Sequence, residues 1–108
     1  MATTYKVLGQ NSPSATTNTD IYTVPAATST VISTLAICNR STTTTYRVAV
    51  RPAGAALANQ HYIVYDNYVN QYDTVFLTLG MTLAATDVVT VYAGTANLSF
   101  SLFGSENT

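Results

Sequence analysis

The sequence has very little charge. Of its 108 residues, 4 are Lys or Arg and 5 are Asp or Glu, so the charged fraction is 8%, against roughly 25% in an average soluble domain. With a net charge of −1 there is no basic excess to neutralise phosphates, which excludes an electrostatic nucleic-acid binder. Because so few charged side chains are available to keep a free surface soluble, we expect a homo-oligomer or a subunit of a large assembly. The alternative is a secreted β-module whose surface is hydrated by hydroxyl groups.

Cysteine, histidine and long apolar runs are also scarce. One Cys and one His exclude an internal disulfide and a zinc cluster of the usual kind. No apolar run approaches the roughly 20 residues of a transmembrane helix, so no membrane partner is expected. Residues 1–10 lack a basic segment followed by an apolar one, so no secretory leader is expected. The 47% hydrophobic fraction argues against disorder.

Strand-forming residues dominate what is present. The chain has 20 Thr, 8 Ser and 8 Tyr, a composition typical of strands, and no segment keeps a helical period. About eight short strands separated by turn signals predict an all-β chain with a single antiparallel β-sandwich, either jelly-roll or Ig-like. Residues 1–19 are expected to form an extended N-terminal arm and loop with one short strand, Tyr5–Leu8. Residues 20–108 are expected to form the sandwich domain.

The later strands are predicted at residues 20–24, 30–39, 46–51, 60–65, 74–79, 87–93 and 97–103. Residues 30–39 show little alternation, which predicts a strand covered on both faces and a buried, inert Cys38. Residues 46–51 alternate, with Tyr46, Val48 and Val50 on one face. Residues 52–59 have room for one helical turn, and residues 66–73 are expected to be a polar connection. The last two strands are expected to form a hairpin around residues 94–96, with Leu98, Phe100 and Leu102 facing the core.

Residues that could carry chemistry are few. His61 stands alone, and a metal site needs three or four converging ligands. Asp66 and Asp73 could bind calcium through oxygen atoms, or they could be turn residues that hydrogen-bond their own backbone. No nucleophile motif accompanies His61. We expect a protein that is not an enzyme, with no catalytic residue, cofactor or metal.

A group of aromatic and basic residues supplies the interface candidates. These are Tyr62, Tyr65, Tyr68, Tyr72, Arg47 and Arg51. The tyrosines can anchor a subunit interface, stack on sugars, or be half-buried strand residues with solvated hydroxyls. The two arginines can reach an acidic neighbour in another subunit, pair locally with Asp66 or Asp73, or face solvent.

Five stretches, taken in order, carry a resemblance to a known family. They are residues 22–33 (YTVPAATSTVIS), 36–40 (AICNR), 46–53 (YRVAVRPA), 87–93 (DVVTVYA) and 97–106 (NLSFSLFGSE). From about Tyr5 to Glu106 the chain resembles a family of small virion structural proteins of tailed bacteriophages, notably those that infect cyanobacteria. The resemblance carries no catalytic residue.

The resemblance implies a place in the virion, with assembly in the host cytoplasm. Two roles follow. One is a capsid decoration or cement protein that binds the major capsid protein and stiffens the shell, preferably as a homotrimer. The other is a structural protein of the tail, neck, baseplate or fibre, with a glycan-binding tyrosine cluster as one possibility. In the first role, an edge strand or the arm at residues 1–19 would bridge to neighbouring chains.

Overall fold

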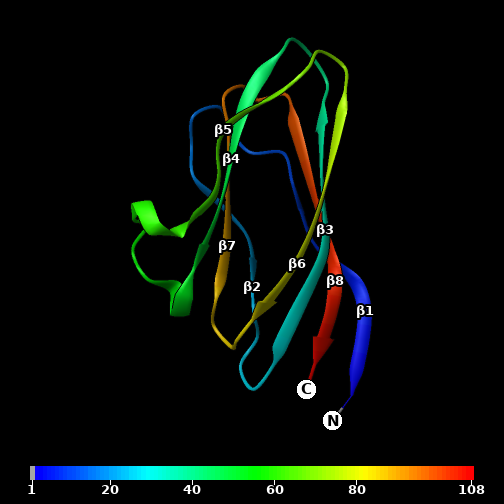
Figure 1. Cartoon of the computed structure of the whole chain (residues 1–108), viewed down its shortest axis with the longest axis vertical. Helices are drawn as coiled ribbons and strands as arrows, with labels where there is room; N and C mark the ends of the chain where they lie inside the picture. The colour runs from blue at the N-terminus through cyan, green and yellow to red at the C-terminus, as the bar shows by residue number, and fades with distance from the viewer. Residues whose placement is uncertain (1) are drawn as a thin grey trace.

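Two antiparallel sheets packed face to face make up the protein (Figure 1). The computed structural model describes residues 2–108. The strands are β1 (Thr3–Asn11), β2 (Thr19–Thr23), β3 (Ser29–Asn39), β4 (Thr44–Arg51), β5 (Tyr62–Val69), β6 (Thr74–Leu83), β7 (Val88–Ala93) and β8 (Leu98–Asn107). Two short 3₁₀ turns, η1 (Pro52–Gly54) and η2 (Asn59–His61), lie between β4 and β5. The expected β-sandwich of eight strands is confirmed, and η1 supplies the expected helical turn.

The strand order identifies the sandwich as a jelly roll. Sheet A has the order β1-β8-β3-β6, and sheet B has the order β2-β7-β4-β5. Every connection passes from one sheet to the other except β4 to β5, whose strands are neighbours in sheet B. Four strands in each sheet with this alternation are the arrangement of a double-sheet jelly roll rather than of the Ig fold.

The same order corrects three local predictions. The expected hairpin of β7 and β8 is wrong, because β7 pairs with β2 and β4 while β8 pairs with β1 and β3. The arm and loop expected at residues 1–19 contain a full strand of the sandwich, since β1 (Thr3–Asn11) pairs with β8 along its length, and the sandwich therefore begins well before residue 20; Met1 lies outside the described residues. The connection expected at residues 66–73 begins only after Val69, where β5 ends.

A β-bulge explains why the sequence of β3 shows little alternation of apolar and polar residues. Ile32 and Thr34 pair with the consecutive residues Gly104 and Phe103 of β8, so Ser33 is an inserted residue in β3. On the other side of β3, Leu79 and Gly80 of β6 lie opposite Ser33. The extra residue switches the inward positions from even to odd numbers, so Thr30 and Ile32 face the core before it and Leu35 and Ile37 after it. Gly80 adopts φ +59° here, and β6 continues through it instead of ending.

The two inner faces meet in a continuous apolar core. Its fully buried members include Tyr46, Val48, Ile32, Leu35, Ile37, Val89, Val91, Leu98, Phe100 and Leu102. The inward positions expected for Leu98, Phe100 and Leu102 are therefore confirmed, and so is the buried face of β4. Asn39 is the largest buried amide, and its side chain donates to the carbonyls of Thr42, Val69 and Asn70. It thereby fastens the β3–β4 and β5–β6 loops to each other.

Candidate functional site

The outer face of sheet B carries most of the predicted site residues. Arg47 lies between two aromatic rings, with its guanidinium carbon 4.3 Å from the centroid of Tyr65 and 4.2 Å from that of Tyr92. Its Nε donates to Asp66 Oδ1 at 2.6 Å. The hydrogen bond from Arg47 lowers the pKa of the Asp66 carboxyl. Of the partners expected for Arg47, the structure selects Asp66, and stacking on two rings fixes the guanidinium.

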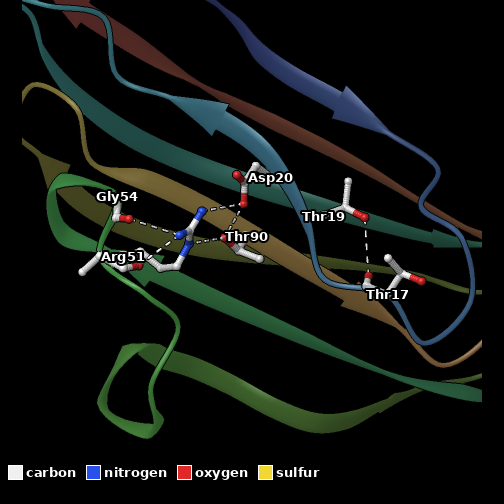
Figure 2. A network of polar contacts seen from close by, with 7 residues as sticks. Thr17, Thr19, Asp20, Arg51, Gly54 and Thr90 are labelled. Carbon is white, nitrogen blue, oxygen red and sulfur yellow. Dashed lines mark hydrogen bonds and ion pairs between the residues drawn. The ribbon is translucent and has the colours of Figure 1, made fainter.

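Arg51 is held in a network of its own, three strands wide (Figure 2). Its guanidinium donates to Thr90 Oγ1 at 3.0 Å, to Asp20 Oδ1 at 2.8 Å, and to the carbonyls of Gly54 and Ala55. Thr90 also donates to Asp20 at 2.9 Å. Arg51 thus pairs with Asp20 of β2, across β7, and not with Asp66 or Asp73 as the sequence allowed. Its donors bind within the chain, which assigns it a structural role.

The four candidate tyrosines do not form one cluster. Tyr62 and Tyr65 meet edge to face, with ring centroids 4.9 Å apart. Tyr68 and Tyr72 are 70% and 72% exposed, one on the edge strand β5 and the other in the turn after it. The sequence analysis missed Tyr92, which comes from β7 and completes the pair of rings around Arg47.

The outer face of sheet A differs sharply in chemistry. Strand alternation and register place these side chains on it: Tyr5, Val7 and Gln10 of β1; Val31, Ser33, Thr34, Ala36 and Cys38 of β3; Thr74, Phe76, Thr78 and Thr82 of β6; and Ser99, Ser101, Phe103 and Ser105 of β8. None of these described residues is charged. The face is made of hydroxyl, amide, thiol and apolar groups.

The charged side chains all lie elsewhere. Arg47, Arg51, Asp20 and Asp66 pair on sheet B, and Lys6 pairs with Glu106 at 3.0 Å where β1 meets β8. Arg40, Asp73 and Asp87 lie in loops; Arg40 reaches only the end of the sheet A face, where it donates to Ser99. The outward side chains of the four sheet A strands are therefore uncharged, and charge reaches this face only at its margins, through Arg40 from a loop and Lys6 beside the groove.

Two apolar features interrupt the uncharged face. A groove of about 600 Å³ is lined by the apolar or aromatic Tyr5, Val7, Val31 and Phe103 and by Lys6, Ser33, Gly104 and Ser105. Tyr5 is 84% exposed and Val7 is 49% exposed. On the other edge strand of the same sheet, Phe76 stands 68% exposed. Large exposed aromatic side chains on an uncharged surface are typical of the centre of a protein interface.

The remaining candidates have structural places. His61 is buried at the end of η2, and its Nδ1 accepts the backbone N–H of Ala58. Cys38 is exposed, so the prediction of a buried thiol is wrong; the bulge at Ser33 turns residue 38 outward. Among residues 2–108, no group of three or more His, Cys, Asp or Glu side chains is placed to hold a metal ion. The described residues also include no helix long and apolar enough to cross a membrane.

A polar latch joins the two sheets at one end of the core. The buried Tyr22 of β2 donates to Glu106 of β8, and its hydroxyl also meets Thr30 of β3 at 2.8 Å. Hydrogen bonds from Tyr22 and Lys6 lower the pKa of Glu106. Burial and the neighbouring carboxylate raise the pKa of Tyr22 to about 12. The latch favours an ionised Glu106 beside a neutral Tyr22.

The functional interpretation of this chain rests on its fold and its surfaces. No protein-family model matches the chain, and no curated protein sequence matches it.

Proposed function

We propose that this chain is a non-enzymatic structural protein of a bacteriophage virion that acts as a capsid decoration or cement protein. The observation that carries the proposal is the uncharged outer face of sheet A, with its exposed Tyr5, Val7 and Phe76. Depletion of charge and enrichment of aromatic side chains characterise the core of protein interfaces. The resemblance of the sequence to phage virion proteins supports a bacteriophage particle as the assembly to which the chain belongs.

The mechanism is mechanical. Each subunit buries its own core between sheets A and B, so it reaches the particle already folded. Its uncharged face is then free to be covered by a neighbouring chain of the particle. At about 25 cal/mol for each Å² of apolar area buried, many modest contacts repeated over a shell add up to substantial resistance to internal pressure.

The jelly-roll fold by itself does not distinguish between several roles. Jelly rolls serve in viral capsids, in lectins and in cupins, so the site and not the fold has to decide. The alternative role is a tail, neck or baseplate protein that binds glycans through its tyrosines. It is favoured by the exposure of Tyr68 and Tyr72 but weakened at Tyr65, where Arg47 already lies against the ring that would have to stack on a sugar.

Copy number in the purified particle tests the proposal. Quantitative mass spectrometry would compare this chain with the major capsid protein. A decoration protein is present in a fixed, high ratio to the shell subunit, and the purified chain rebinds to shells that lack it. A few copies per particle would favour the tail, and loss of glycan binding in Tyr68→Ala or Tyr72→Ala would then identify the receptor role. Absence from the particle would overturn both roles.

A further inference from the structure

We propose that the outer face of sheet A binds a second copy of this chain about a two-fold axis, with Phe76 of each copy seated in the apolar groove of the other. This inference rests on the proposed role as an assembling subunit, and it names one partner of the uncharged face. The two features involved are the exposed Phe76 side chain and the groove lined by Tyr5, Val7, Val31 and Phe103.

The projecting side chain and the groove lie apart on one face. Phe76 pairs with Ala36 in the middle of β3, while the groove lies over β1, β8 and the beginning of β3 around Val31. Their levels along β3 differ by about 15 Å at the usual rise of a strand. A two-fold axis in the plane between two stacked faces, midway between these points, exchanges them. Both Phe76 side chains then enter grooves at the same time, as an isologous contact requires.

The chemistry of the face fits a copy of itself. A charged surface that stacks on its own copy brings like charges together, which costs several kcal/mol. The sheet A strands avoid this cost, because none of their outward side chains is charged. Hydroxyl groups both donate and accept, so rows such as Thr34, Thr78 and Thr82 can hydrogen-bond to the same rows in a partner.

The size of the face is adequate for a stable pair. The protein measures 44 × 27 × 19 Å along its principal axes, and sheet A follows the longest of them (Figure 1). A face of this length, four strands wide, offers an area of the order of the ~800 Å² that each partner buries in a standard interface. Because the side chain and its groove share one face, a two-fold pair fits this face; the homotrimer expected above stays a prediction.

Variants that introduce a charge test directly whether Phe76 enters the partner's groove. Phe76→Lys places a cation where the partner's groove is apolar, and Val7→Glu places an anion in that groove. Each variant alone should weaken dimerisation by at least about 100-fold in sedimentation equilibrium, because each dimer loses two aromatic contacts. An equimolar mixture should recover dimers, because one Lys then meets one Glu and the second Phe76 enters an unaltered groove.

A matched control distinguishes the specific contact of Phe76 from the general effect of replacing an exposed aromatic residue with lysine. Tyr68, at 70% exposure against 68% for Phe76, lies on the opposite sheet, so Tyr68→Lys should dimerise as the unaltered chain does. Circular dichroism confirms that each variant is folded. A monomeric unaltered chain, an oligomer that survives Phe76→Lys, or a mixture that fails to recover dimers would each overturn the two-fold pair. Copy number in the particle is measured separately, so the virion role can stand where this inference fails.

Discussion

Arg51 is expected to stabilise the fold by linking strands that are distant in the sequence. Its side chain is 17% exposed and donates to four different residues, while the carboxylate of Asp20 is 52% exposed. Replacing Arg51 with Met keeps the aliphatic packing and removes all the donors. Because water can reach Asp20 and the two carbonyls, the exposed ion pair contributes only about 0.5 kcal/mol. The bond to the buried Thr90 contributes about 1 kcal/mol more.

The expected loss of unfolding free energy is thus about 1.5 kcal/mol, which lowers the Tm of a domain of this size by about 6 °C. Urea unfolding measures this loss of unfolding free energy. Far-UV circular dichroism follows the unfolding, because the chain has 0 Trp and gives no tryptophan fluorescence. The protein concentration is held fixed and low, because self-association would raise the apparent stability.

A double-mutant cycle with Asp20→Asn isolates the pair and should give a coupling energy of about 0.5 kcal/mol. Arg51→Lys, which keeps the charge but loses the planar fork, should recover less than half of the loss. Arg51→Met with unchanged stability, or full recovery by Lys, would refute the role given to the network.

Two further predictions concern the backbone and the latch. Gly104→Ala should destabilise the fold by at least about 2 kcal/mol, because a Cβ there would lie 2.1 Å from the carbonyl oxygen of Val31; Gly80→Ala, at φ +59° in open space, should cost only about 1 kcal/mol, and equal losses in urea titrations would contradict this. Since the pKa of Glu106 is lowered in the folded state, its stabilisation is present above the unfolded value of about 4.3 and is lost as the pH falls through the folded pKa. The raised pKa of Tyr22 has the opposite sign: its contribution is complete below about pH 10 and is lost as the pH rises through about 12. Glu106→Gln and Tyr22→Phe should each flatten the matching limb of a stability–pH curve, and unchanged limbs would exclude the latch as their cause.

The fold could be predicted from composition and alternation because most strands keep the period of two. The buried face of β4 and the inward set on β8 follow directly from their sequences. The prediction failed where a bulge changes the period: the inserted Ser33 removes the alternation from the sequence of β3, so the strand was predicted to be buried on both faces and Cys38 to be buried. The β7–β8 hairpin failed for another reason, because a short connection between two strands does not reveal that they belong to different sheets.

The surfaces were less predictable than the strands. Spacing along β4 identified Arg47 and Arg51, but their partners depended on strand order, which brings Asp20 and Tyr92 from β2 and β7. The uncharged face draws residues from four strands that span the whole chain. Low total charge was the only trace of it in the sequence, and it could not reveal on which side the charges were missing. Tyr5 and Val7 are predicted from the sequence to lie in a short strand of an arm, and in the structure they line the groove.

The central claim, that the outer face of sheet A is covered in the assembly, can be tested with the single cysteine of the chain. Cys38 is exposed on that face in the isolated monomer. Its rate of alkylation by N-ethylmaleimide would be measured by mass spectrometry in intact virions and in the same virions after dissociation into folded subunits, diluted until they are monomeric. We predict strong protection in the intact virion and rapid alkylation after dissociation. Equal rates in the two states would mean that the face stays open to solvent and would contradict the account.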